Sequence, residues 1–254
     1  MVGVLVRLAF HDAAGENGAN GCIDWSTSAH NGLRPAVTQL DKVYAAHNFH
    51  ALLSKADFWV LAANVAIEVA TQGVVVPFQW GRTDALTCND ANLLPDPEGD
   101  HRHMHDVLST RMGLTDQEVA ALLGAHALGR METSNSGFNG GWTTTQNVLD
   151  NSLYKIATKE PWFKRVNSRG FSEWVNADLP CNCNHSYCAQ DLLFLNTDVS
   201  LFTDTTVGEC NVFPGSNCTV DSPYRVYVDV YAANNTVWMR DFVDAMVRLC
   251  GVGY

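Results

Sequence analysis

Arg7 and His11 stand four residues apart near the start of the sequence, in the segment Arg7-Leu8-Ala9-Phe10-His11-Asp12. If this segment is helical, both side chains emerge from one helix face. A base and a permanent cation would then be directed at the same small volume, a combination that could activate a peroxide. Alone, the pair proves little, because this spacing also occurs by chance and is more simply explained as a surface pair or a packed histidine.

A second histidine, His126, stands on another apolar segment, which begins with the capping box Thr115-Asp116-Gln117-Glu118 and ends near Gly129. For either histidine alone, a hydrogen-bonded core histidine is the simpler interpretation. Together, they suggest two helices that enclose a bound group, with one histidine as a ligand and the other as an acid-base group.

The apolar periodicity predicts a mostly α chain with little β structure. Phe78-Gln79-Trp80 and Phe194-Leu195 are too short for more than a small ribbon. The helices are predicted at about Met1–Ala14, Arg34–Ala46, Ser54–Ala70, Met104–Arg111, Thr115–Gly129, Asp150–Lys159 and Val237–Leu249.

The charge balance narrows the class of partner. Sixteen basic against 27 acidic residues give a formal net charge of −11 over 254 residues, which argues against nucleic acid or an anionic membrane as the main partner. No apolar run is long enough for a membrane span, and the chain opens on a predicted helix rather than on a signal peptide. A mature or trimmed start is the expectation.

Eight cysteines form an even set, most of them in the C-terminal third, where Asn184, Asn217 and Asn234 begin three glycosylation sequons. Disulfides in an oxidising compartment would explain both features, so a secreted glycoprotein is expected, with an intracellular location as the alternative. A zinc site on Cys181-x-Cys183-x-x-x-x-Cys188 is the competing interpretation, although no second pair of cysteines completes it.

Four ordered segments carry a resemblance to a known family. They are Arg7-Leu8-Ala9-Phe10-His11-Asp12, Gly124-Ala125-His126-Ala127-Leu128-Gly129, Gly140-Gly141-Trp142-Thr143 and Asn196-Thr197-Asp198-Val199-Ser200-Leu201. In order and spacing they resemble the signature segments of the plant, fungal and bacterial haem peroxidase superfamily. Ala56-Asp57-Phe58-Trp59, Pro77-Phe78-Gln79-Trp80-Gly81-Arg82 and Leu94-Pro95-Asp96 are most similar to its intracellular class I branch, the cytochrome c and ascorbate peroxidases.

The resemblance implies a two-lobed helical fold with haem b between distal and proximal helices. It implies a single domain over 1–254, with a distal lobe at about 1–112 and a proximal lobe at about 113–254. His126 resembles the proximal iron ligand, and Asp198 resembles the carboxylate that accepts the proximal ring N–H and stabilises high-valent iron. Trp142 matches a tryptophan that carries a radical in some members, with a packed core indole as the alternative.

On the distal side, His11 resembles the base that moves a proton between the two oxygens of hydrogen peroxide, and Arg7 would stabilise the developing charge. The haem-contacting residues implied are His126, Pro95, Phe10 and Trp142. The asparagine that usually orients the distal histidine is expected where His30 stands, and the neighbouring residue is Asn31. The sequence therefore leaves open which of the two holds His11.

Two cation sites are also implied by the resemblance. Oxygen ligands for a proximal potassium or calcium ion match Thr143, Thr145, Val148 (through its carbonyl) and Asp150. A distal calcium ion would use Asp12, Asp24 and Ser26, with a solvated turn as the alternative. The alternating His101, His103 and His105 are expected to be solvated rather than to bind a metal.

The function expected from the resemblance is that of a haem peroxidase. It would reduce hydrogen peroxide to water through a ferryl intermediate and oxidise small aromatic or phenolic donors in one-electron steps. Asn135 replaces the ascorbate-binding arginine of the class I branch, so a donor other than ascorbate is implied. The alternatives are a haem-binding pigment or structural protein with little activity, and a peroxidase that takes electrons from a protein donor.

Overall fold

The computed structural model describes residues 1–88, 93–176, 192–207 and 220–253 of the chain. The chain forms two compact units, Met1–Leu94 with Val243–Tyr254 and Pro95–Phe242. Within the described residues, ten α-helices and five short strands are found, which confirms the predicted mostly helical class. None of the described helices is long and apolar enough to cross a membrane.

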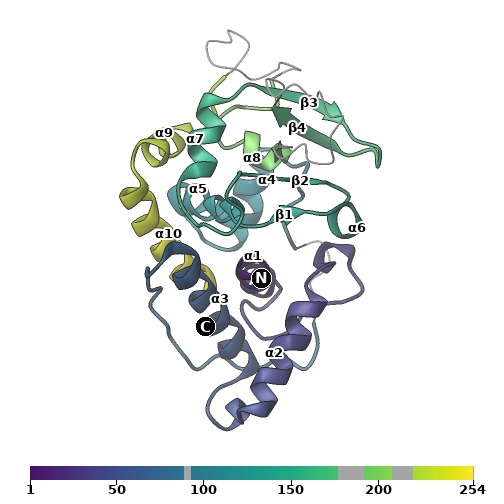
Figure 1. Ribbon diagram of the computed structural model, residues 1–254, viewed down its shortest axis with the longest axis vertical. Helices are drawn as coiled ribbons and strands as arrows, with labels where there is room; N and C mark the ends of the chain where they lie inside the picture. Colours follow the sequence, from purple (N-terminus) through teal and green to yellow (C-terminus); the bar gives the residue numbers. More distant parts are fainter. Residues whose placement is uncertain (89–92, 177–191, 208–219, 254) are drawn as a thin grey trace. The chain divides into compact units, whose positions relative to one another are not determined.

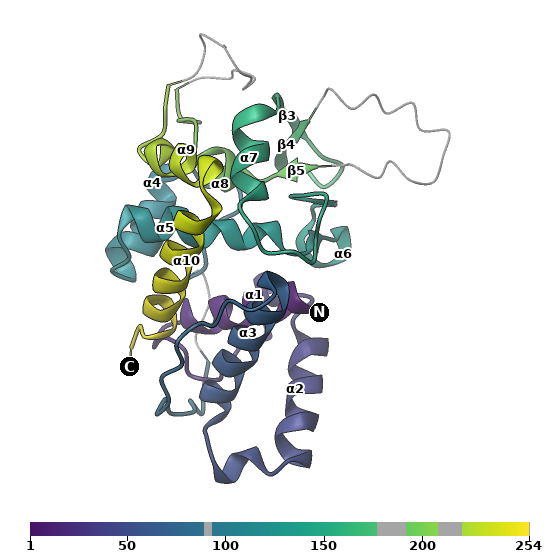
Figure 2. The same ribbon diagram turned by 60° about the vertical axis from the view of Figure 1, so that its left-hand side comes forward.

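The first unit is built on three α-helices: α1 (Val2–Ala13), α2 (Arg34–Ala46) and α3 (Lys55–Thr71). Two 3-10 turns, η1 (Ser28–His30) and η2 (Phe49–Ala51), flank α2, and the unit also takes the last residues of α10 (Asn235–Cys250). α1 lies against α3 (Figure 1, Figure 2). The core of the unit is apolar and consists of Leu8, Ile23, Leu33, Val37, Phe58 and Trp59.

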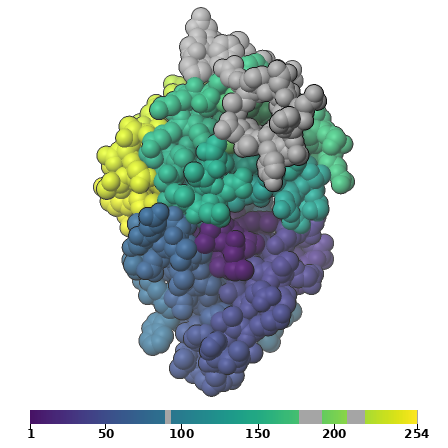
Figure 3. All heavy atoms as spheres, viewed as in Figure 1, coloured from purple at the N-terminus to yellow at the C-terminus, as the bar shows by residue number. Residues whose placement is uncertain are grey.

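The apolar face of α1 packs on this core, because its apolar residues repeat at helical spacing. Leu8 and Ala9 on this helix have no exposed surface. Met1 is 84% exposed, and the first residues of the chain (purple) reach the surface beside blue residues of the same unit in Figure 3. α3 begins at Ser54, whose hydroxyl accepts a hydrogen bond from the Asp57 amide at 3.0 Å. The buried Asp57 then pairs with Arg82 at 2.8 Å.

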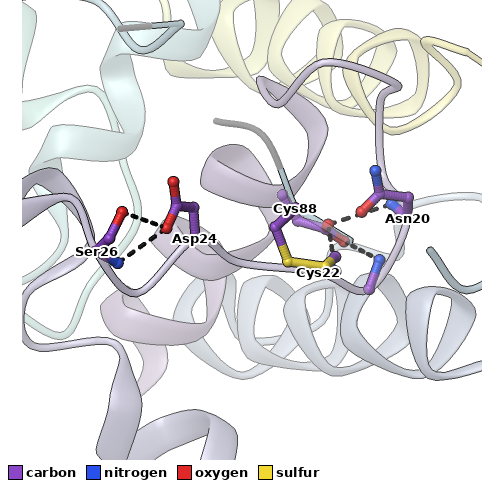
Figure 4. Close-up of a disulfide and its surroundings, with 7 residues drawn as sticks. Asn20, Cys22, Asp24, Ser26 and Cys88 are labelled. Carbon is purple, nitrogen blue, oxygen red and sulfur yellow. Dashed lines mark hydrogen bonds between the residues drawn. A yellow bond between two sulfur atoms is a disulfide. The ribbon is translucent and has the colours of Figure 1, made fainter. Parts of the chain in front are cut away.

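Arg82 binds the C-terminal end of α10 within the first unit: its Nε and Nη2 donate to the Cys250 carbonyl at 2.9 and 2.8 Å. A disulfide joins Cys22 to Cys88 (Figure 4). Cys250 is a buried free thiol, and burial raises its pKa to about 12. The remaining cysteines of the predicted framework, the zinc alternative, Asn184 and Asn217 lie outside the described residues.

The second unit begins with α4 (His101–Met104), which runs directly into a π-helical turn, η3 (His105–Arg111). The predicted start at Met104 is therefore three residues late, because the Asp100 carboxylate caps the helix by accepting from the Arg102 and His103 amides at 2.9 and 3.0 Å. α5 (Asp116–Leu123) begins with the predicted capping box on Thr115 and Glu118, and the 3-10 turn η4 (Gly124–Ala127) follows it.

Short antiparallel strands complete the second unit. β1 (Arg130–Met131) pairs with β2 (Gly140–Gly141), and the three-stranded sheet has the order β3 (Trp162–Val166), β4 (Ser172–Asn176), β5 (Leu193–Phe194). In this sheet Trp162 faces Asn176 and Trp174 faces Phe194. The unit also contains α6 (Thr133–Ser136), α7 (Ser152–Lys159), α8 (Asn196–Val199), α9 (Arg225–Ala233) and the first half of α10; α8 contacts β4 and β5, and α7 packs against α9.

The architecture differs from the sequence prediction in several places. The β3–β4 hairpin and α9 were not predicted. The segment Phe78-Gln79-Trp80 is not a strand, and Leu195 follows β5 rather than belonging to it. The strands were missed because neither β3 nor β4 shows a clear alternation: Trp162 is buried but its four successors on β3 are partly or fully exposed.

Candidate active site

Arg7, His11 and His30 form a cluster in the first unit, here called the base cluster. Arg7 and His11 share one face of α1, as their spacing predicts, and the Arg7 Nε donates to the His11 Nε2 at 3.2 Å. On the other side of the imidazole, the Nδ1 of His11 lies 2.9 Å from the Nδ1 of His30. Both histidines are buried, with 8% and 1% of their surfaces exposed.

Two backbone carbonyls of the η1 segment fix the Arg7 side chain. Its Nη2 donates to the Ala29 carbonyl at 2.8 Å, and its Nη1 donates to the Asn31 carbonyl at 3.0 Å. Desolvation by burial lowers the pKa of Arg7 from its ordinary value. A guanidinium held in this way by neutral acceptors keeps its charge without a carboxylate to neutralise it, as electrostatic stabilisation of a developing negative charge requires.

His11 is held in its neutral form by its surroundings. Burial is the largest cause of a pKa well below the ordinary histidine value, and the charges of Arg7 and His30 add to it. A neutral imidazole can accept a proton, so this environment suits a base at ordinary pH. Phe10 lies beside it, edge to face, with the ring centroids 5.9 Å apart.

In the structure, His30 rather than Asn31 contacts the His11 side chain. His30 contacts it through the ring nitrogen, whereas Asn31 is exposed and its backbone carbonyl serves Arg7. An imidazole therefore occupies the position at which the resemblance implies an asparagine amide. The contributions of the Ala29 and Asn31 carbonyls were not predicted, because backbone acceptors leave no trace in residue types.

His126, Trp142 and Asp198 form a second cluster, in the second unit, here called the ligand cluster. The predicted hydrogen bond is present: the His126 Nδ1 lies 2.7 Å from the Asp198 Oδ1. The Trp142 Nε1 donates to the Asp198 Oδ2 at 2.8 Å, and the indole stacks on the imidazole with ring centroids 4.4 Å apart. Asp198 thus joins an iron-ligand candidate to an oxidisable ring.

Asp198 reaches both rings from the first turn of α8. The backbone amide of Leu195, just before that helix, gives the carboxylate a third donor at 2.7 Å. Such a bond is favoured where an acidic residue stands three positions into a helix. The Asp198 side chain has no exposed surface, and its carboxylate oxygens lie 2.7–2.8 Å from three nitrogens, those of His126, Trp142 and Leu195.

The turns that carry the two rings are tied together by Thr143, next to Trp142. Its hydroxyl donates to the carbonyl of Ala127, next to His126, at 3.0 Å. Gly129 strengthens the link through its amide, which donates to the Gln146 carbonyl at 2.7 Å. The stacking of Trp142 on His126 is therefore fixed by backbone contacts on either side.

The donor set of the ligand cluster fits haem. With Nδ1 engaged by a buried carboxylate, the other ring nitrogen of His126, Nε2, is the one that can bind iron, and the side chain is 35% exposed although Gly124 and Ala127 on the same turn are buried. A carboxylate behind the imidazole fixes its tautomer and orientation, as metal-bound histidines require. Pro95, the remaining predicted haem contact, is partly buried in the same unit.

The residues of the predicted distal calcium site have hydrogen-bond partners within the chain. Both oxygens of the Asp12 carboxylate accept backbone amides, those of Asn20, Gly21 and Cys22, at 3.0–3.2 Å. Asp24 instead accepts from the amide and hydroxyl of Ser26 at 2.9 and 2.7 Å (Figure 4). These contacts are compatible with the alternative given for this segment, a turn, and a calcium ion at Asp12, Asp24 and Ser26 remains a prediction.

The proximal cation residues also have partners within the chain. The Thr143 hydroxyl is bonded to Ala127, and the Asp150 carboxylate accepts from the Ser152 amide at 2.9 Å at the start of α7. The Val148 amide donates to the Thr145 carbonyl at 3.0 Å. A potassium or calcium ion at these oxygens remains a prediction.

The three alternating histidines are engaged separately. His101 lies 3.5 Å from Asp204, His103 accepts from the Asp96 amide at 2.8 Å, and His105 lies 3.2 Å from Asp116. Across the parts of the chain that the structure describes, no three histidine, cysteine or acidic side chains are grouped for a metal ion.

Comparisons with known proteins agree with this geometry. The family model described as "Peroxidase" matches residues 1–212. A mitochondrial cytochrome c peroxidase from Aspergillus fumigatus is 30% identical over 98% of this chain and 63% of its own length. One from Neurospora crassa is 30% identical over 98% and 64%. A candidate heme-binding peroxidase from Gibberella zeae is 30% identical over 98% and 71%.

These comparisons correct the predicted location. The relatives from Aspergillus and Neurospora are named as mitochondrial, so the prediction of a secreted protein, drawn from cysteines and sequons, is contradicted. The chain spans 63% and 64% of the lengths of these two relatives. With a family match over most of its length and the ligand cluster in place, the chain belongs to the peroxidase family, in the class I branch of the haem peroxidase superfamily that includes the cytochrome c peroxidases.

Proposed function

We propose that the chain binds haem b through the Nε2 of His126 and reduces hydrogen peroxide at the expense of a one-electron donor. Haem, when bound, supplies the iron at which peroxide is reduced. The observation that carries the proposal is the buried Asp198, which accepts from both the His126 Nδ1 and the Trp142 Nε1. A core histidine without a ligand to hold has no need of such a carboxylate.

The residues of the base cluster would handle the protons and charge of the peroxide. His11, kept neutral by burial and by Arg7, would accept a proton from one peroxide oxygen and return it to the departing one. Arg7 would stabilise the charge on the departing oxygen, because its guanidinium is fixed in advance by two carbonyls. Phe10 would limit access of water to the same volume.

Two classes of electron donor are compatible with the sequence. Small aromatic or phenolic molecules are one. A cationic protein is the other, and it is favoured by the net charge of −11 and by relatives named for cytochrome c. Those names also support an intracellular location. A potassium or calcium ion on Thr143, Thr145, Val148 and Asp150 is a further prediction, which metal analysis of the purified protein checks.

The test is the visible absorption spectrum of the haem-reconstituted chain before and after stopped-flow mixing with hydrogen peroxide. We expect a rapid spectral change that His11→Leu slows by about 10²–10⁴-fold. His126→Leu should abolish stoichiometric haem binding, whereas the exposed His47→Leu should leave binding and rate unchanged. A haem spectrum that does not respond to peroxide would instead support a pigment or structural role.

A further inference from the structure

The contact between His11 and His30 determines where the protons of the base cluster lie. The Arg7 Nε can only donate, so the Nε2 of His11, 3.2 Å away, must accept. In neutral His11 the proton is then on Nδ1, and it points at the Nδ1 of His30, 2.9 Å away. His30 therefore accepts through Nδ1 and carries its own proton on Nε2.

One added proton reverses this arrangement. If His30 binds the added proton, both nitrogens of its ring carry hydrogen, and its Nδ1–H would face the Nδ1–H of His11 across the 2.9 Å contact. His11 must then move its own proton from Nδ1 to Nε2. If His11 takes it, Nε2 is protonated directly. In either case the Nε2 of His11 carries a hydrogen and can no longer act as a base.

We propose that His30 is a positioning residue for His11, which keeps the Nε2 of His11 unprotonated by accepting its Nδ1 proton and makes the peroxide reaction depend on the protonation of the histidine pair. The proposal rests on the proposed function of His11. An amide in this position would accept the same hydrogen bond at every pH. An imidazole does so only while it is neutral.

The charges facing His30 act in opposite directions. From α1, Arg7 opposes protonation of the pair, and from the loop before η1, Asp24 interacts electrostatically with His30 and favours it. Asp24 is exposed and held by Ser26, so its influence is screened by solvent. Because burial and Arg7 hold the pKa of His11 well below its ordinary value, the pair is expected to take up a proton only at a pH lower than a free imidazole requires.

The experiment compares His30→Asn and His30→Leu with the wild-type holoenzyme by stopped-flow reaction with hydrogen peroxide from pH 5 to pH 8. In the wild type the second-order rate constant should fall with decreasing pH. His30→Asn should match the wild type at pH 8 and increasingly exceed it as the pH falls, since a titratable partner is lost. His30→Leu, which fills the space without an acceptor, should lose about 10–100-fold at all pH values.

A second measurement reads the tautomers directly. Histidine ¹⁵N chemical shifts of the full chain, loaded with the diamagnetic zinc protoporphyrin, should show a protonated Nδ1 on His11 and a protonated Nε2 on His30 at pH 8. Wild-type and His30→Asn profiles that coincide, or a protonated Nε2 on His11 at pH 8, would overturn the role of His30. If the wild type does not react with peroxide at all, the proposed function fails, and the ¹⁵N shifts still decide the tautomer.

Discussion

At the scale of single residues, Asp198 and His30 decide what the two catalytic histidine candidates can do. Asp198 is buried and accepts three hydrogen bonds, so it delivers negative charge to the His126 ring without solvent to weaken it. His30 contacts His11 as a neutral, titratable acceptor. The two imidazoles therefore differ in electron density: His126 is suited to binding iron, and His11 is suited to moving protons.

Replacing Asp198 by asparagine should raise the reduction potential of bound haem. The amide keeps the shape but not the charge, and its N–H₂ group faces donors, so the imidazole loses its anionic partner. We expect a higher midpoint potential in a spectroelectrochemical titration and a loss of about 1–3 kcal/mol in the free energy of unfolding. Asp229→Asn, at an exposed position on α9, is the control. An unchanged potential in a folded Asp198→Asn protein would contradict the assigned role.

The buried His11 should make the stability of the chain dependent on pH. Its pKa is lowered in the folded state, by burial first, so the unfolded chain takes up a proton below about pH 6.5 while the folded chain does not. The free energy of unfolding should therefore be unaffected above this pH and fall below it, by at most about 1.4 kcal/mol per pH unit for this group.

Urea titrations at pH 7.5 and at pH 5.5 measure this dependence. His11→Gln should show a smaller loss of stability between the two pH values than the wild type, and the exposed His47→Gln should lose as much as the wild type. The explanation is wrong if His11→Gln and His47→Gln lose the same amount.

At the scale of elements, short helices and turns place the ligand cluster. His126 lies on η4, the turn after α5, and Asp198 lies in the first turn of α8. α5 begins with a capping box in which the Glu118 carboxylate accepts from the Thr115 amide at 2.7 Å. Its buried residues, among them Val119 and Leu122, lie on the side that packs into the unit. The start of α5 therefore contributes to the position of His126 ten residues later.

Thr115→Ala should destabilise the protein by about 1 kcal/mol, because the helix loses the side-chain acceptor for the Glu118 amide. Thr38→Ala, in the middle of α2 on an exposed face, should change the free energy of unfolding by less than about 0.5 kcal/mol. Chemical denaturation monitored by far-UV circular dichroism compares the two variants. Equal losses would show that the cap contributes nothing beyond an ordinary surface threonine.

At the scale of the whole molecule, the sequence carries 27 acidic and 16 basic residues. A surface with this excess of negative charge attracts cationic macromolecules over about a Debye length and has no such effect on neutral donors. The charge therefore bears on the choice of donor rather than on the chemistry of the clusters.

Turnover with a cationic donor protein, such as purified cytochrome c, should slow at least tenfold between about 20 and 200 mM salt, because screening removes the long-range attraction. Turnover with a neutral phenol such as guaiacol should change little over the same range, which controls for salt effects on the enzyme itself. The protein-donor proposal is contradicted if cytochrome c is not oxidised, or if its rate has the same salt dependence as that of the phenol.

The sequence alone predicted most of the longer helices and most of the residues of both clusters. Arg7 and His11 meet because residues four apart share a helix face, and capping residues such as Ser54 and Thr115 mark helix starts locally. The pairing of His126 with Asp198 came from the family resemblance, and the structure places the two within hydrogen-bond distance.

Tertiary structure decided what depends on contacts between distant segments. The packing of the 15–31 loop on α1 brings His30 rather than Asn31 to His11. The same packing decides which carbonyls bind Arg7 and places backbone amides at Asp12. The β3–β4 hairpin is likewise fixed by pairing and by burial of Trp162 and Trp174 rather than by a local pattern. Helical periodicity and caps act within a few residues and so appear in the sequence, whereas these contacts depend on the folded path of the chain.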